Sequence, residues 1–462
     1  MRQQNSFAMT VVCLSLWPAQ AIAQGGAHAH NPISIVDTGD RLKLFGPPEY
    51  PPTVHNVGPP NHNLLSGLLN IGDGWPENFL YVEPLPPPTQ LVPLVVMFHK
   101  FGSTQLDLTK NTNFPNEVGA RGWYLVCPLA ANTQHFGSLQ SQVHMEAVIL
   151  DMLARYPLID RNRIYAVGFS MGAGAVANYA ARHVDPAKPM IAAMAAMSGG
   201  FSLPDTYYSD PPARIYLDFW FGNNTVGSAD AWKMARSSSV CFDPITGQVQ
   251  SGTDLARNLT HIPMQIYHPV EDPLPYLMRQ GDIMSAHMQT LGAVVGPDFG
   301  YQHVPFGVDS YDHKWSMMDS RWTFGWLGQH TLSLPTAART LADHDGIYFH
   351  FFVEQDTASA FTPFDWQLDT ANNALRLAAT SNLKRLTVDT LAAGLDPSMP
   401  LRIDLSTADG LADQVVFTSV PAAPTQVSRD GNATVAWNYN ATAQELTLIE
   451  SDGLPHIWSV VP

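Results

Sequence analysis

Three residues, in the chain order Ser170, Asp272 and His313, are of the types that carry out nucleophilic acyl transfer. A serine hydroxyl is a weak nucleophile until a histidine takes its proton, and a carboxylate is needed to orient that histidine. This chain order is typical of sites in which each residue follows a strand of one parallel sheet. The elements around the three residues therefore decide whether their side chains can meet.

Ser170 is the centre of a Gly-x-Ser-x-Gly motif that runs from Gly168 to Gly172. The apolar run Ile164–Val167 before it predicts a buried strand, and the small residues after it favour a helix. This strand–turn–helix context predicts a nucleophile elbow. The two glycines avoid a clash at the strained turn, and the helix start directs free N–H groups toward a developing oxyanion. We therefore interpret Ser170 as a nucleophile rather than as a structural turn serine.

The acid and the base are expected in loops after later strands. Asp272 lies in a proline-bounded turn after the predicted strand Pro263–Tyr267, and His313 follows the short predicted strand Tyr301–Val304. The sequence leaves two rival acids and two rival bases: Glu271, Asp282, His268 and His303. We favour Asp272 because Asp282 falls in a predicted helix. We favour His313 because His303 lies inside or just after its strand.

An oxyanion needs two preorganised donors. One is expected from the backbone N–H of Met171, and the other from Phe101 in the loop after the predicted strand Leu91–Phe98. The ring of Phe101 either borders the acyl pocket or packs in the core. Four further residues are predicted to line the substrate pocket: His99, Lys100, Trp220 and Trp315.

The elements that must position these residues occupy residues 76–335. Apolar runs alternate there with helical segments, which predicts an α/β fold with a doubly wound, mostly parallel sheet. Ser141–Tyr156 has helical spacing, with Val143 and Leu150 on the face expected to be buried. Residues 201–258 interrupt the alternation and are rich in aromatic residues. They form either a lid-like roof over the site or an ordinary pair of packed helices.

The two flanking regions differ from this central part. Residues 24–75 are rich in Pro, Gly, Asn and His and are predicted to be irregular. Residues 336–462 contain short alternating segments separated by turns such as Asp430-Gly431 and Asp452-Gly453, which predicts an all-β, sandwich-like C-terminal domain. Its tryptophans could pack in its core or contact a polymer.

Composition and targeting signals restrict the setting and the partners. The net charge of -16 over 462 residues argues against nucleic acid and anionic membranes as partners. Residues 1–23 read as a signal peptide, with Arg2, the apolar run Phe7–Trp17 and a small-x-small end, so we expect a secreted protein without membrane insertion. Cys127 and Cys241 would then remain, either bridged or free. No metal or organic cofactor is expected.

Several of these stretches resemble secreted α/β-hydrolase esterases, a group that includes feruloyl and acetylxylan esterases and polyhydroxyalkanoate depolymerases. The resemblance covers roughly residues 76–330 and rests on 94–102, 160–172, 197–200, 268–276 and 312–315. It implies Ser170, Asp272 and His313 as the triad, with Phe101 and Met171 at the oxyanion. The chain departs from the family at Lys100 and Pro269, where the family usually has glycine.

Three functions are compatible with these features. The first is a secreted serine esterase acting on bulky or polymeric esters, such as acylated polysaccharide or polyester. The second is a prolyl-oligopeptidase-like serine peptidase, although only about fifty predicted loop residues stand where that class carries a large β-domain. The third is a non-catalytic binding protein on a hydrolase fold, which would be expected to lack a member of the triad.

Overall fold

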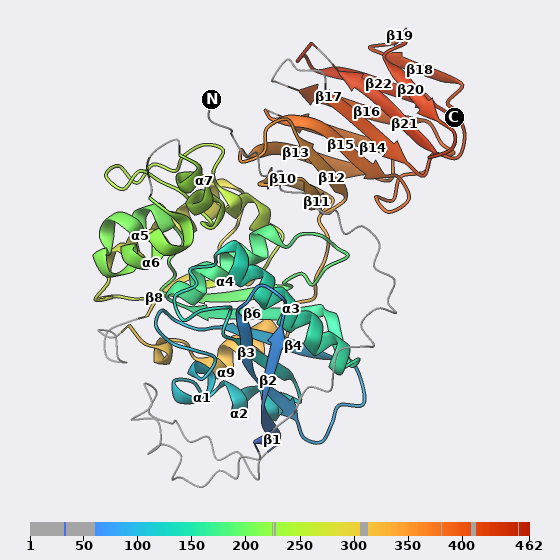
Figure 1. Ribbon diagram of the computed structural model, residues 1–462. Helices are drawn as coiled ribbons and strands as arrows, with labels where there is room; N and C mark the ends of the chain where they lie inside the picture. The colour runs from blue at the N-terminus through green and yellow to red at the C-terminus, as the bar shows by residue number, and fades with distance from the viewer. Residues whose placement is uncertain are drawn as a thin grey trace, which may run out of the picture.

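The computed structural model describes residues 32–33, 61–223, 225, 228–304, 313–379, 381–407, 413–450 and 452–462. The centre of the protein is a mixed sheet, which has nine strands among these residues (Figure 1). In chain order the strands are β1 (Pro32–Ile33), β2 (His62–Asn70), β3 (Pro76–Pro84), β4 (Val92–Phe98), β5 (Tyr124–Pro128), β6 (Ile159–Phe169), β7 (Ala193–Met197), β8 (Met264–Pro269) and β9 (Phe299–Val304). Their spatial order is β1-β2-β3-β5-β4-β6-β7-β8-β9. The pairs from β5 to β9 are parallel, and those from β1 to β5 are antiparallel.

Helices cover both faces of this sheet. They are α1 (Asp107–Lys110), α2 (Phe114–Arg121), α3 (Leu139–Arg155), α4 (Met171–Arg182), α5 (Leu203–Ser209), α6 (Pro211–Phe221), α7 (Ala229–Arg236), α8 (Pro275–Thr290) and α9 (Ser320–Leu327), with short 3-10 turns η2 (Leu255–Leu259) and η3 (Trp315–Met317). On β4, Leu94 and Val96 pack in the core shared with α3, α4 and α8. Val95 and Met97 point to the other face, which α1, α2 and α9 cover. The apolar run of β4 is therefore buried on both sides, as expected for a strand inside a doubly wound sheet.

Two sequence predictions within this region are wrong. The segment predicted to be irregular, 24–75, contains β2, a nine-residue strand paired with β3. The predicted buried face of α3 is also incorrect, because Val143 and Leu150 are exposed. The buried side of α3 instead combines apolar residues such as Met145 and Met152 with Gln142 and His144, whose hydrogen bonds satisfy them inside the protein.

The two cysteines of the described chain are not bridged. Cys127 on β5 and Cys241 after α7 are both buried and free. Burial raises the pKa of both thiols, which keeps them protonated and unreactive. The disulfide that secretion would have permitted is therefore absent. The predicted signal peptide, residues 1–23, lies outside the described residues.

The C-terminal region consists of two sheets that enclose one core. One sheet has the order β10-β13-β14-β16-β22-β18-β19 and the other β11-β12-β15-β17-β21-β20. Their bounds are β10 (Ala337–Ala342), β11 (Gly346–Tyr348), β12 (Phe351–Gln355), β13 (Thr362–Asp369), β14 (Ala374–Ala379), β15 (Leu383–Asp389), β16 (Leu401–Thr407), β17 (Asp413–Thr418), β18 (Gln426–Arg429), β19 (Asn432–Ala433), β20 (Trp437–Asn440), β21 (Glu445–Glu450) and β22 (His456–Val461). Leu377 of the first sheet and Leu386 of the second share that core, so the region is a β-sandwich, as predicted. Trp366 and Trp458 are core residues of it.

The sandwich attaches to the α/β region at the end of helix α4 that is far from Ser170 (Figure 1). Asp343, at the end of β10, accepts hydrogen bonds from Arg182 of α4 at 2.8 Å and from Arg236 of α7 at 2.9 Å. Asn258 of η2 exchanges two further hydrogen bonds with the backbone of Leu341. Burial raises the pKa of the Asp343 carboxyl, but Arg182, the hydrogen-bonded His344 and Arg236 together hold it well below its usual range.

No helix among the described residues has both the length and the apolar character needed to cross a membrane.

Asp343→Asn should destabilise the junction between the two regions. Removing the carboxylate leaves two largely buried guanidinium groups without their counter-ion, which costs roughly 3 kcal/mol. The matched control is Asp365→Asn, since Asp365 meets Arg339 at 3.5 Å on the surface and its loss should cost under about 1 kcal/mol. Urea denaturation of both variants beside the wild type measures the difference.

The acid dependence of stability has a defined sign at this junction. The pKa of Asp343 is lower in the folded protein than in the unfolded chain. The free energy that its carboxylate contributes to stability is therefore complete above the unfolded pKa and is lost as the pH falls toward the folded pKa. The difference in stability between wild type and Asp343→Asn should therefore shrink as the pH is lowered below about 4. An equal loss in Asp343→Asn and Asp365→Asn at neutral pH would contradict this account of the junction.

Candidate active site

Ser170 stands at the turn between β6 and α4 in a conformation that non-glycine residues rarely adopt. Its φ is 57° and its ψ is -122°, and such strain persists only where the surrounding structure enforces it. Its backbone N–H donates to Met197 O at 2.8 Å, and its carbonyl accepts from Gly200 N at 3.2 Å. The residue is largely buried but not closed off, because 7% of it remains exposed.

Three glycines allow this turn to exist. A Cβ on Gly168 would lie 2.4 Å from Gly172 O, and a Cβ on Gly172 would lie 2.1 Å from Phe98 O at the end of β4. A Cβ on Gly174 would lie 1.9 Å from Gly200 O, after β7. All three neighbours are backbone atoms that cannot move aside. The elbow is therefore held between the ends of the two strands that flank β6.

Asp272 and His313 form a hydrogen-bonded pair. Nδ1 of His313 lies 3.0 Å from Oδ2 of Asp272, while Oδ1 of Asp272 accepts from Leu274 N at 2.8 Å. Burial raises the pKa of Asp272, but the hydrogen bond and the charge of His313 bring it below its usual value, so the carboxylate stays ionised. Among the described residues, Nε2 of His313 has no hydrogen-bond partner. The ring lies against Phe169, the residue before Ser170, with centroids 4.5 Å apart.

The rival acids and bases lie elsewhere. Asp282 accepts from Tyr301 OH on the α8–β9 side, and Glu271 is exposed at the turn before Asp272. His268 is fully buried, with Nδ1 3.8 Å from Oδ2 of Asp272, so it backs the acid from inside the protein. His303 pairs with His268 across β8 and β9, and its side chain is outside the described part of the chain. The geometry thus singles out the pair His313–Asp272.

The two predicted oxyanion donors lie on elements that touch. Met171 is the first residue of α4, and Phe101 follows the end of β4, against which Gly172 packs. Within the described residues, neither backbone N–H donates a hydrogen bond to the protein. The side-chain contacts agree with this placement, since the ring of Phe101 packs against the hydrophobic cluster that contains Met171. Both groups are therefore available to a ligand oxygen beside Ser170.

The predicted pocket residues in the oxyanion loop have different roles. The ring nitrogens of His99 lie 2.9 Å from the carbonyl oxygens of Lys100 and Leu129, so this buried residue fixes the loop and does not line a pocket. Lys100 places its ammonium 6.0 Å from the centre of the Phe169 ring. Burial lowers the pKa of Lys100, and Lys314 adds to this, against the opposing effect of Asp107.

Trp315 is a core residue, which corrects its predicted place in the pocket. It is almost fully buried between Phe114 and Phe169, with ring centroids 5.3 Å from each. Its Nε1 donates at 2.9 Å to Asp107, which also accepts from the backbone N–H of Lys100. Trp315 therefore joins the loop that carries His313 to the loop that follows β4. The short loop has no periodic pattern from which the burial of Trp315 could have been predicted.

The insertion 201–258 both roofs the site and packs as a helix group. Leu217 and Phe221 of α6 are buried with Met171, next to the nucleophile. Tyr216 lies 5.3 Å from the ring of Phe101, and Trp220 donates from Nε1 to Gln134 O at 2.7 Å. Figure 1 shows α5, α6 and α7 together at one end of the sheet. The predicted placement of Trp220 beside the site agrees with these contacts.

The loop after β5 is a wall of the site that the sequence analysis did not assign. Phe136 in this loop contacts Phe101 with centroids 5.5 Å apart and packs with Met171. Because β5 is parallel to β4, its carboxyl end must lie at the same edge of the sheet as the oxyanion loop. This topological rule could have identified the loop, although it could not have picked out Phe136.

A buried charged group fixes that wall. Glu77 of β3 accepts hydrogen bonds from the N–H groups of Ala130 and Ala131, both of which have positive φ, at 2.9 and 2.8 Å. His144 of α3 contacts Glu77 at 2.9 Å and Asp73 at 2.8 Å. Burial lowers the pKa of His144, but the two carboxylates raise it overall. This charged group therefore holds the β5 loop, α3 and the β2–β3 hairpin together.

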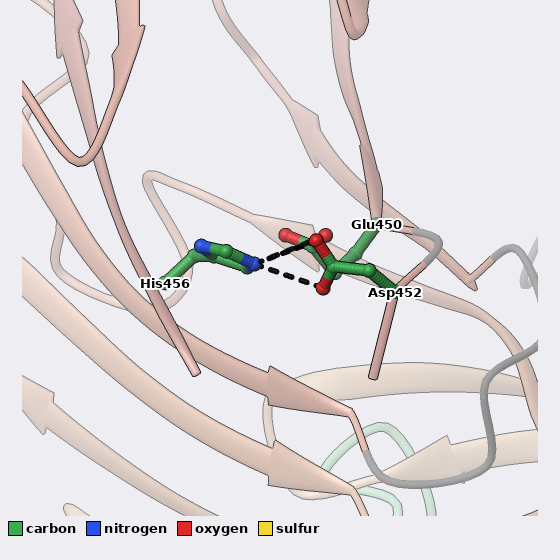
Figure 2. A group of neighbouring side chains, drawn as sticks. All are labelled: Glu450, Asp452 and His456. Carbon is green, nitrogen blue, oxygen red and sulfur yellow. Dashed lines mark hydrogen bonds and ion pairs between the residues drawn. The ribbon is translucent and has the colours of Figure 1, made fainter. Parts of the chain in front are cut away.

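One group of potential metal ligands occurs among the described residues, in the β-sandwich and far in sequence from the triad. Figure 2 shows His456 turned toward Asp452, with Glu450 beside it. Arg429 donates to Glu450 at 2.8 Å, and Trp458 donates to the other carboxylate oxygen at 3.1 Å. Donors of the protein itself thus engage the Glu450 carboxylate, and Arg429 supplies a positive charge to both Glu450 and Asp452. The group is an ion-pair cluster of the sandwich.

Comparisons with known proteins give only distant matches. No family model and no curated protein matches the chain. Similar solved structures include an acylaminoacyl peptidase of Pyrococcus horikoshii (15% identity, TM-score 0.44), an S-formylglutathione hydrolase from Agrobacterium tumefaciens (11%, 0.42) and a ferulic acid esterase (15%, 0.41). The aligned part is 59% of this chain and 42% of the peptidase, 59% of this chain and 97% of the formylglutathione hydrolase, and 58% of this chain and 98% of the ferulic acid esterase. The match thus spans less than half of the peptidase. At these scores the site must be interpreted from its own geometry.

Gly172→Ala should disable the elbow while leaving the fold intact. The added Cβ would have to displace the backbone at Phe98, which moves Ser170 relative to the oxyanion loop. A displacement of this size costs about 100-fold in turnover. The matched control is Gly325→Ala in α9, where an added Cβ meets nothing within 4 Å. Turnover of a soluble ester and circular dichroism of both variants test the difference, and an active Gly172→Ala enzyme would contradict the proposed contact.

Asp272→Asn should lower turnover by about 10⁴-fold, because the amide no longer holds the His313 tautomer that leaves Nε2 free to act as a base. The controls are the two rival acids, as Glu271→Gln and Asp282→Asn, which should each retain activity within a few-fold. Steady-state kinetics on one soluble ester suffice. If Asp282→Asn lost activity and Asp272→Asn kept it, the assignment of the acid would have to be abandoned.

Proposed function

We propose that this protein is a serine hydrolase that cleaves carboxylic esters through an acyl-enzyme. The observation that carries the proposal is the strained conformation of Ser170 at the tip of the elbow, together with the His313–Asp272 pair. The His313 ring lies against Phe169, and its Nε2 has no hydrogen-bond partner among the described residues. Backbone strain of this kind has a cost, and it is retained where it presents a side chain to a ligand. The non-catalytic alternative offers no reason for this arrangement.

The proposed reaction gives each of these groups a role. Nε2 of His313 takes the proton from Ser170 Oγ as that oxygen attacks the ester carbonyl, and Asp272 stabilises the resulting imidazolium through Nδ1. The N–H groups of Met171 and Phe101 bind the oxyanion. The intermediate collapses as His313 returns the proton to the leaving alcohol. Water then repeats the sequence on the acyl-enzyme, releasing the acid and restoring Ser170.

The surroundings of the site favour bulky or polymeric esters. The rings of Phe101, Phe136, Tyr216 and Trp220 supply an apolar wall beside the nucleophile, where an acyl chain can be bound by contact rather than by hydrogen bonds. The β-sandwich attaches at the end of α4 that is far from Ser170. The leader-like residues 1–23 support secretion, which would bring the enzyme to insoluble material.

Ser170→Ala should abolish hydrolysis of p-nitrophenyl butyrate, with a loss of about 10⁶-fold, because the nucleophile and its base act as one unit. Ser209→Ala is a matched control on α5, where the hydroxyl contacts Asp205 away from the triad. Residual activity of Ser170→Ala near the wild-type value would remove the proposal. Cleavage of proline-containing peptides by the wild type, without ester hydrolysis, would instead establish the peptidase alternative.

A further inference from the structure

Helix α6 exposes apolar side chains on the side that a surface helix normally keeps polar. Ala213, Leu217 and Phe221 make its buried face. On the opposite side Ile215 is 70% exposed and Phe219 is 62% exposed, with Tyr216 and Trp220 beside them. Ile215 and Phe219 are about one helical turn apart, as are Tyr216 and Trp220. Together these four residues form a continuous stripe, which we call the α6 face. An exposed apolar surface of this kind usually marks a binding surface.

The α6 face continues directly into the wall of the candidate active site. Tyr216 contacts Phe101, whose backbone N–H is a candidate oxyanion donor. Trp220 contacts Trp75 of the β2–β3 hairpin with centroids 6.0 Å apart and donates to Gln134 O. Phe219 packs edge-on against Trp220. An extended apolar molecule lying on Ile215 and Phe219 would therefore be led toward Ser170.

The helix that carries this face is firmly held. Asp210 caps it by accepting from Ala213 N at 3.1 Å, and it also accepts from Tyr276 OH at 2.7 Å. Tyr276 begins α8, directly after the loop that carries Asp272. The loop of the catalytic acid and the α6 face are thus fixed to each other. A surface that is already ordered loses little conformational entropy when it binds a ligand.

Charge and chemistry restrict what the face can bind. Arg214, the one cationic residue in the α6 sequence, donates to Tyr207 O at 2.9 Å and lies over the Tyr207 ring, so it is directed toward α5. The net charge of -16 opposes binding to anionic surfaces. Of the four side chains of the face only Tyr216 and Trp220 carry a polar group, and the N–H of Trp220 is already engaged by Gln134 O. An uncharged, apolar polymer fits these properties better than an acylated polysaccharide or a phospholipid headgroup layer.

We propose that the α6 face adsorbs the surface of a water-insoluble aliphatic polyester and so delivers its ester groups to Ser170. The proposal rests on the proposed esterase function for its purpose, but the adsorption itself needs no catalysis. Apolar side chains bind such a surface by removing contact with water, at a free energy proportional to the area covered. Ile215 and Phe219 supply the most exposed area of the face.

Adsorption can be tested without turnover in the full-length Ser170→Ala protein. Depletion from solution by poly(ε-caprolactone) film gives the affinity, which Ile215→Ser/Phe219→Ser should weaken by roughly tenfold. The matched control is Ile245→Ser/Val435→Ser, which removes apolar side chains that are 92% and 96% exposed on other parts of the surface. This control should adsorb like its Ser170→Ala parent.

With Ser170 intact, the ratio of film hydrolysis to p-nitrophenyl butyrate hydrolysis should fall by about tenfold in Ile215→Ser/Phe219→Ser and stay constant in the control. Equal adsorption by both double variants would overturn the proposal. So would conversion of a wild-type dimer to a monomer by Ile215→Ser/Phe219→Ser without loss of adsorption, or stronger adsorption to phosphatidylcholine vesicles than to film. A wild type that adsorbs but hydrolyses no soluble ester would refute the esterase function alone.

Discussion

The contact between the elbow and the end of β4 is the constraint on which the site depends. Gly172 packs so closely on Phe98 O that no side chain fits between them, and this contact sets the distance from Ser170 to the oxyanion loop. On the other side Gly174 meets Gly200 O in the same way. Because both neighbours are backbone, the strained φ of Ser170 is enforced from two directions. The nucleophile and its candidate oxyanion donors are positioned by one steric arrangement.

The rest of the protein braces the elements that meet at this point. Asp107 links the loop after β4 to Trp315, two residues after His313. Glu77 and His144 hold the wall that contains Phe136. The β-sandwich binds Arg182 at the far end of the helix that begins beside Ser170, so it supports the elbow helix from behind. Buried charges are costly unless they are satisfied. Glu77 and Asp343 have cationic partners, and Asp107 accepts hydrogen bonds from N–H groups.

The sequence predicted the parts of this arrangement that depend on local pattern. The apolar runs of β4, β6, β8 and β9, the Gly-x-Ser-x-Gly turn and the all-β character of the C-terminal region follow from periodicity and turn residues. Other features depend on contacts between distant segments. Burial of Trp315 requires Asp107 as its partner, and the polar face of α3 requires Glu77 and Asn178. The strand β2 was missed because its Leu-Leu-Ser-Gly-Leu-Leu sequence lacks a clear alternation.

Covalent labelling tests the central claim, which is that Ser170 is a nucleophile activated by His313, most directly. The full-length protein is treated with an ethyl p-nitrophenyl phosphonate and then mapped by peptide mass spectrometry. We expect one phosphonyl group, located on Ser170, with labelling absent from Ser170→Ala and much slower in His313→Ala. Labelling of another residue at a comparable rate, or a rate on Ser170 that does not depend on His313, would contradict the account.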